Sequence, residues 1–224
     1  MFALLLLCWG AAGAATPQRA AFRVTLTGTL TKDWRVTRTV TAECDEVTTH
    51  TGHWRLTLAT VRPTRIVALG PSAPGRPLRI SPGIVRSISG RAVQSGSVFV
   101  STGGPGCTRS TRRSTCASAR RSFRGATVRL TSPSRRTARF ARLQGASAAR
   151  SFRGLCPEEP AEIRRLRTDL SLADAPLSIA DVFNRNVPTF FISGDTVQET
   201  TIEEEYEGKV VERVRWKLSF TRLG

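Results

Sequence analysis

Apolar and polar side chains alternate along much of this chain, which is the period of half-buried β-strands. From Phe22 to Leu30 the apolar residues fall on even positions and Arg or Thr on odd positions. The alternation resumes from Trp34 to Cys44, so a turn at Lys32-Asp33 predicts a hairpin. A third strand, Trp54–Leu58, is predicted to follow a polar turn at Thr49–His53.

Shorter strands follow, separated by segments rich in Gly, Pro and Ser. They are predicted at residues 66–69, 83–88, 97–101, 126–131 and 138–143. The segment 70–77, GPSAPGRP, is a surface loop by composition, or a seam between subdomains.

The last third predicts two short helical segments and a closing hairpin. Pro157 and two acidic residues precede apolar residues at helical spacing up to Leu170, and Ser178–Phe183 fits a second helical turn. A loop at Glu207-Gly208-Lys209 gives the hairpin a register that opposes charges and apolar residues. The predicted pairs are Tyr206 with Val210, Ile202 with Val214, Glu203 with Arg213, and Glu199 with Lys217.

These patterns predict a mostly β protein, an antiparallel β-sandwich or a partly closed barrel, with one or two short helices. Residues 1–15 are apolar or small, too short a run to cross a membrane, and are interpreted as a secretory signal peptide that contains Cys8. Residues 16–224 then form a single domain. Since no other stretch is apolar enough to span a bilayer, we expect a secreted or extracytoplasmic protein, soluble or associated with the cell surface.

Four cysteines remain, Cys44, Cys107, Cys116 and Cys156, and an even number in an exported protein predicts two disulfides. Three pairings are possible. The local pairing Cys107–Cys116 would close a small Arg-rich loop and leave Cys44 to join Cys156. A zinc site is the weaker interpretation, because the chain has no Cys-x-x-Cys pair.

Charge gives the clearest functional signal. The protein has a formal net charge of +17, and no Asp or Glu lies between Val47 and Pro157, a stretch that holds 20 Arg. Such a stretch predicts binding to an anionic partner through bidentate guanidinium contacts and a positive field. The candidate anion-binding residues are Arg109, Arg112, Arg113, Arg120, Arg121, Arg124, Arg135, Arg136, Arg139 and Arg142. The alternative, a solvated basic surface, stays open with equal weight.

For an exported protein the expected partners are an anionic envelope polymer, lipid headgroups or an acidic protein surface. Nucleic acid is disfavoured, since Phe123, Phe140 and Phe152 fit core positions of strands better than stacking positions, and no nucleic-acid-binding motif occurs. The favoured function is therefore a non-catalytic binding or structural protein of the cell envelope, without a cofactor. Its oligomeric state is left open.

The rival function is a secreted hydrolase or a metal-dependent enzyme. His50 and His53 are the two histidines, and with a nearby acid they could chelate a metal or supply a general base. No nucleophile motif or paired-carboxylate motif supports such an enzyme.

Overall fold

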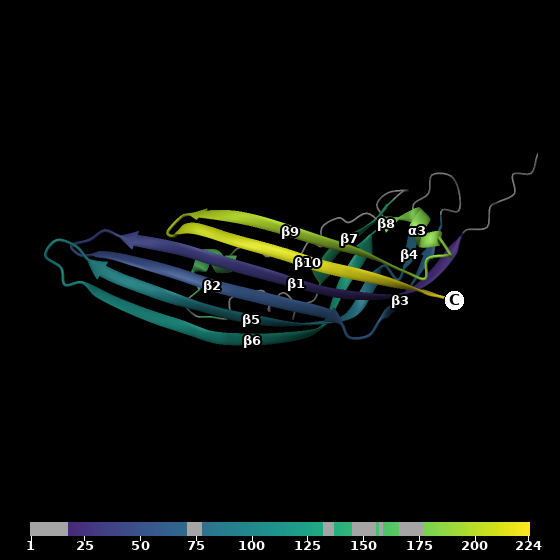
Figure 1. Ribbon diagram of the computed structural model, residues 1–224, viewed down its shortest axis with the longest axis horizontal. Helices are drawn as coiled ribbons and strands as arrows, with labels where there is room; N and C mark the ends of the chain where they lie inside the picture. The colour runs from purple at the N-terminus through teal and green to yellow at the C-terminus, as the bar shows by residue number, and fades with distance from the viewer. Residues whose placement is uncertain (1–17, 71–77, 132–136, 145–155, 157–158, 166–176) are drawn as a thin grey trace, which may run out of the picture.

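The protein forms one antiparallel sheet of ten strands that curls into a half-barrel, with two very short helices (Figure 1). The computed structural model describes residues 18–70, 78–131, 137–144, 156, 159–165 and 177–224. The partly closed barrel is confirmed and the sandwich is not. The predicted signal peptide, residues 1–15, and most of the predicted 70–77 loop lie outside the described residues.

The strands are long and their order follows a simple path. In chain order they are β1 (Arg19–Val40), β2 (Asp45–Thr60), β3 (Thr64–Leu69), β4 (Arg79–Ser81), β5 (Ile84–Gly103), β6 (Ser110–Thr131), β7 (Thr137–Gln144), β8 (Leu177–Ser178), β9 (Thr189–Glu203) and β10 (Glu207–Leu223). Strand β1 lies between β10 and β2, so the main path runs β9-β10-β1-β2-β5-β6-β7-β8. Strands β3 and β4 continue the sheet beside the N-terminal part of β1.

The two faces of the sheet differ sharply in composition. The inner face is the side on which helices α2 (Ala161–Arg165) and α3 (Ile179–Phe183) pack, and its side chains form one apolar core. On β1 this face carries the even residues from Phe22 to Val36, while the odd residues, mainly Thr and Arg, lie on the outer face in contact with solvent. The period-2 alternation of the sequence therefore separates core from solvent along β1 as far as Val36.

Glycines facing aromatic rings help the sheet to curl. Gly52 lies across from Trp34, Gly90 across from Phe123, and Trp216 lies between Gly28 and Gly194. A Cβ on Gly52, Gly90 or Gly194 would overlap the facing ring. Because each glycine has no side chain, the facing ring can occupy the space next to it, and the neighbouring strands can bend toward the inner face.

A segment from the last third of the chain covers part of the inner face. Cys156 is disulfide-bonded to Cys116 of β6, and Ile163 in α2 is fully buried. The ammonium Nζ of Lys32 donates a hydrogen bond of 2.8 Å to the carbonyl oxygen of Ile163. Farther along the chain, the Arg222 guanidinium donates to the carbonyl oxygen of Val182 over 2.8 Å.

Two disulfides are present, as predicted, but the local pairing is wrong. Cys44 joins Cys107 and Cys116 joins Cys156. Cys107 precedes β6, whereas Cys116 lies inside this extended strand, where each residue advances the chain by about 3.3 Å. The extended chain between Cys107 and Cys116 therefore holds their Cα atoms too far apart for a disulfide. Two disulfides are typical of oxidising, extracytoplasmic compartments.

Both predicted turns in the first sixty residues are wrong. Lys32-Asp33 lies within β1 and Thr49–His53 lies within β2, which pair with each other without interruption from Thr27 to Val40. Lys32 suggested a turn because Lys is seldom buried, yet its side chain is on the inner face and only 5% exposed.

The helical segments and the closing hairpin are confirmed, with different details. Helix α3 coincides with the second predicted turn, and the described part of the first is α2; Pro157, Leu166 and Leu170 lie outside the described residues. In the hairpin, Glu203 pairs with Glu207, so the loop lies three residues earlier than predicted. In the structure Trp216 lies opposite Gly194, where an added Cβ would meet the indole ring of Trp216. The predicted register would instead place Trp216 opposite Thr200, which has a Cβ.

Candidate anion-binding face

The predicted Arg residues do not share one surface. Arg113, Arg120 and Arg124 of β6 lie on the outer face, whereas Arg112 and Arg121 pair with Val100 and Ala92, which are in phase with the inner face. Arg109 is exposed in the turn before β6. Arg139 and Arg142 belong to β7, and Arg135 and Arg136 lie outside the described residues.

The outer face nevertheless collects exposed cations from five strands. Those without an ion pair to any residue that the structure describes include six guanidinium groups: Arg35 of β1, Arg55 of β2, Arg91 of β5, Arg113 and Arg120 of β6, and Arg213 of β10. Two lie outside the acid-free stretch, since Arg35 precedes it and Arg213 follows it, and Arg55 lies near its start, far in sequence from Arg113 and Arg120. Strand pairing, and not sequence proximity, brings these charges together.

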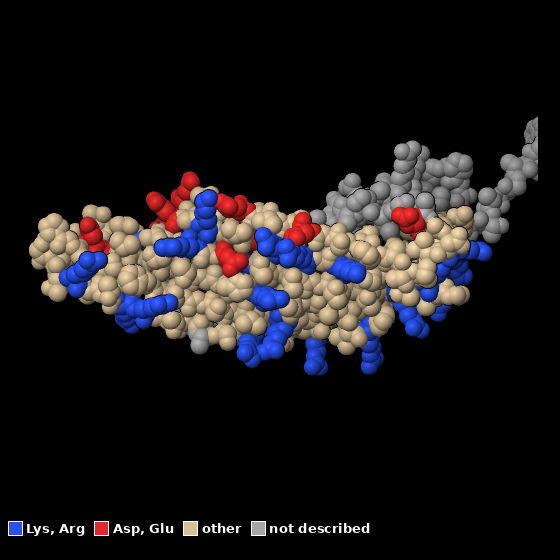
Figure 2. All heavy atoms as spheres, viewed as in Figure 1, with Lys and Arg blue, Asp and Glu red and all other residues tan. Residues whose placement is uncertain are grey.

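Acidic residues gather at one margin of this face. Figure 2 shows Asp and Glu concentrated over the β9–β10 hairpin, while Lys and Arg extend over the remaining strands. Within the hairpin, Lys209 contacts Glu199 at 2.6 Å and Arg215 contacts Asp195 at 2.8 Å. The hydrogen bond to Glu199 raises the pKa of Lys209 above its ordinary value of 10.5. The hairpin therefore neutralises part of its own positive charge.

Three hollows on the outer face lie over the glycine–aromatic pairs. Their volumes are about 610 Å³ over Gly52 and Trp34, about 510 Å³ over Gly28, Gly194 and Trp216, and about 350 Å³ over Gly90 and Phe123. The same sequence feature that allows the sheet to curl thus also shapes its outer surface.

The largest hollow, called here the Gly52 groove, is lined by a row of residues from five strands. Strand pairing aligns Lys209, Arg35, Thr51, Ser97 and Thr115 across β10, β1, β2, β5 and β6. The hydroxyls of Thr51 and Ser97 are hydrogen-bonded at 2.9 Å. Arg113 also lines the groove, and the exposed ring of Phe99 lies beside it on β5. Arg35 therefore lies at one end of a hydroxyl row, and Arg113 lies two residues from Thr115 at the other end. Such an arrangement can bind an anion that also carries hydroxyl groups.

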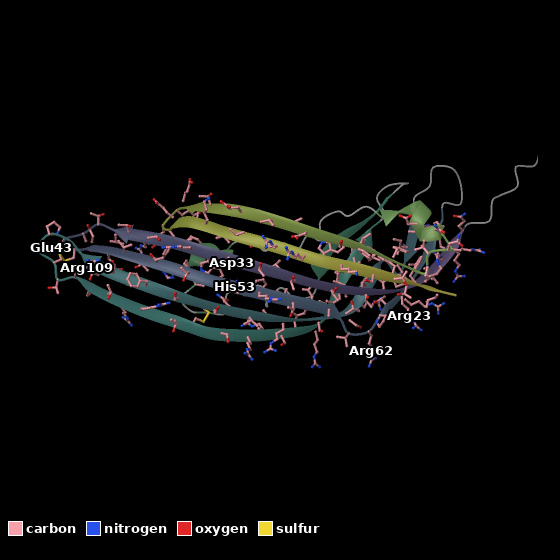
Figure 3. All side chains as sticks on the ribbon, in the orientation of Figure 1. Arg23, Asp33, Glu43, His53, Arg62 and Arg109 are labelled. Atoms are coloured by element: carbon pink, nitrogen blue, oxygen red, sulfur yellow. A yellow bond between two sulfur atoms is a disulfide. The ribbon has the colours of Figure 1, made fainter. Side chains whose placement is uncertain are left out.

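A His–Asp pair lies at the edge of the same groove (Figure 3). His53 Nδ1 and Asp33 Oδ1 are 2.6 Å apart, and both side chains are about half exposed. An ionised carboxylate can only accept, so Nδ1–H donates and the Nε2 atom of a neutral ring keeps its lone pair. Ser95 pairs with His53 on β5, so an acid, an imidazole and a hydroxyl lie in one cross-strand row.

The two histidines are not brought together. His50 is buried on the inner face with its ring edge-on to Tyr206 at 5.1 Å, whereas His53 is on the outer face. Side chains that are three residues apart on a strand point to opposite faces of the sheet. No cluster of three or more His, Cys, Asp or Glu suited to a metal ion occurs among the described residues.

Of the aromatic residues within the Arg-rich stretch, Phe123 is buried in the core, as predicted. Phe140 belongs to β7 and Phe152 lies outside the described residues. In the part of the chain that the structure describes, no helix has the length and apolar character needed to cross a membrane.

Sequence reasoning missed most of the Gly52 groove because it followed the acid-free stretch. Arg35 and Lys209 lie outside that stretch, and Thr51 lies in the Thr49–His53 segment, whose polarity wrongly predicts a turn. The signal that could have found them is the run of Thr and Arg at odd positions through β1, which continues across the predicted turn.

Comparison with known proteins adds no assignment: no family model and no curated protein matches this chain.

Proposed function

We propose that this protein is a non-catalytic binding protein of an extracytoplasmic compartment, secreted or held at the cell surface, whose outer face engages an anionic partner. The single observation that supports the proposal most is the set of six exposed guanidinium groups without an ion pair among the described residues. Carboxylate partners within the fold would cancel such charges. Left uncompensated, they attract anions and can bind them in bidentate fashion.

Position on the fold adds to this argument. Long strands hold the Arg side chains at fixed spacing, so a ligand would meet a prearranged set of charges. The apolar core covers much of the inner face, whereas the outer face carries polar and charged side chains in contact with solvent. An exported protein would meet an envelope polymer, lipid headgroups or an acidic protein there.

Binding of the oxidised protein to a panel of anions tests the proposal. The panel is dextran sulfate, vesicles containing phosphatidylglycerol, and poly-glutamate, with neutral dextran and phosphatidylcholine vesicles as controls. We expect binding to at least one anion at 0.15 M salt, where the screening length is about 8 Å. Weak binding to every anion alike, lost at that salt concentration, would show that the Arg residues form only a solvated surface.

A second function, hydrolysis, is supported by the row of Asp33, His53 and Ser95. The Asp33–His53 contact orients the imidazole as in a general base. Among the described residues, however, His53 makes no hydrogen bond to Ser95, so the hydroxyl is not activated in this arrangement. Replacing His53 with Ala distinguishes the two functions: hydrolysis of a panel of esters and glycosides would be lost if His53 is the base, while anion binding through the Arg residues would persist.

A further inference from the structure

We propose that the Gly52 groove is a specific subsite for an anionic polysaccharide, with Arg35 and Arg113 each holding a separate sulfate, phosphate or carboxylate group and the row of Thr51, Ser97 and Thr115 binding sugar hydroxyls. This inference rests on the proposed function and names its ligand. The groove is the largest of the outer-face hollows described above, and both guanidinium groups lack an ion pair within the described residues.

The hydroxyl row selects the class of partner. Thr and Ser hydroxyls both donate and accept hydrogen bonds, and sugar hydroxyls do the same. Lipid phosphates and protein carboxylates only accept, so they could take the protons of the row but would leave its acceptor lone pairs unmatched, whereas sugar hydroxyls can match both. The Thr51–Ser97 hydrogen bond holds two hydroxyls of the row in place before a ligand arrives.

Phe99 supports a sugar over a simple anion. Its side chain is 44% exposed on β5, and it pairs directly with Arg113 on β6. An exposed aromatic ring beside this groove offers an apolar surface to the C–H face of a sugar ring, whereas an inorganic anion makes no such apolar contact.

The other two hollows fit the same ligand less well. The hollow at Gly194 contains Arg215 and Lys217, but Asp195 pairs with Arg215, and Lys217 lies over the ring of Phe191 at 4.2 Å. The hollow at Gly90 is the smallest of the three, and its Arg124 already has an interaction within the protein. Of the three hollows, the Gly52 groove therefore combines the largest volume with two guanidinium groups that have no ion pair among the described residues.

The test compares two double variants of equal charge. Arg35→Ala/Arg113→Ala removes the groove cations, and Arg55→Ala/Arg213→Ala removes two exposed outer-face cations that line none of the three hollows. Affinity for dextran sulfate is measured by calorimetry at 0.15 M salt, after thermal unfolding shows that both variants fold. We expect the groove variant to lose about tenfold in affinity per guanidinium, and the control to lose only a few-fold.

Equal losses in both variants would overturn the subsite while leaving the proposed function intact. Absence of wild-type binding to every anion would overturn both. A second variant, Thr51→Val/Ser97→Ala, separates sugar from anion: affinity for dextran sulfate falls and binding of inorganic sulfate is unchanged. If dextran sulfate binding is unchanged in that variant, or if only anionic vesicles or poly-glutamate bind the wild type, the polysaccharide assignment is wrong.

Discussion

Lys32 and Arg35 are three residues apart on β1 and lie on opposite faces of one sheet. The Lys32 side chain is on the inner face, 5% exposed, with its ammonium hydrogen-bonded to Ile163 and 4.0 Å from the Glu212 carboxylate. The Arg35 side chain is exposed in the Gly52 groove and has no ion pair among the described residues. A buried charge must be compensated within the fold, whereas an exposed charge is solvated and available to a partner. Stability should therefore depend on the inner face, and binding on the outer face.

The largest expected effect comes from removing the buried charge. Replacing Lys32 with Met should lower the free energy of unfolding by about 3–5 kcal/mol, because the Glu212 carboxylate, only 15% exposed, loses its cation. Chemical denaturation measures this change. The control is Arg55→Met on the outer face, an exposed cation without an ion pair among the described residues, where we expect a change within about 0.5 kcal/mol. Similar effects at both positions would contradict the division between the two faces.

The same lysine predicts a pH dependence. Burial lowers the pKa of Lys32 below 10.5, although Glu212 and Glu159 partly oppose the shift. Between the lowered pKa and 10.5, the unfolded chain binds more protons than the folded protein, so the Lys32 contribution makes stability rise with pH. Denaturation at several pH values up to 10.5 should therefore show the wild type gaining stability relative to Lys32→Met. A difference that is constant with pH would show that Lys32 keeps its ordinary pKa.

A smaller effect should follow from filling the space at Gly52. In Gly52→Ala the new methyl group meets the Trp34 ring, and overpacking of this kind costs about 1–3 kcal/mol. Gly103→Ala in β5 is the control, since no atom lies within 4 Å of an added Cβ there. Thermal unfolding of both variants checks the prediction. A neutral Gly52→Ala would mean that the ring moves easily and that glycine is not needed for the curl.

The sequence predicts the faces of the strands better than their ends. Alternation from Phe22 to Leu30 correctly identifies the core side, because a period of two follows directly from strand geometry. Lys32 and the Thr49–His53 segment were misread as turns, because their polarity resembles a loop, and only a long-range partner such as Ile163 explains a buried lysine. The hairpin register failed for a related reason, since it depends on how Trp216 packs against Gly194.

The candidate site shows the same limit. Net charge and the acid-free stretch predict a cationic protein, and Arg113, Arg120 and Arg124 do lie on the outer face. Arg35 and Arg113 line the same groove only because β1, β2, β5 and β6 pair in that order. Single-sequence reasoning predicts strands but not their order, so the groove could not be assembled before the topology was known.

The smallest expected effect concerns the charge pairs of the β9–β10 hairpin, and it tests whether the outer face contributes to stability at all. Arg215 and Asp195 are directly opposed, their side-chain atoms are 2.8 Å apart, and both side chains are more than half exposed. A double-mutant cycle with Arg215→Ala and Asp195→Ala should give a coupling of about 0.2–1 kcal/mol that declines with added salt, because exposed ions remain hydrated and screened. The cycle is measured by denaturation at 0.05 and 0.5 M salt. A coupling of several kcal/mol that persists at high salt would mean that this exposed pair stabilises the fold as strongly as buried Lys32 does. The two faces would then differ in solvent exposure but not in their contribution to the free energy of unfolding.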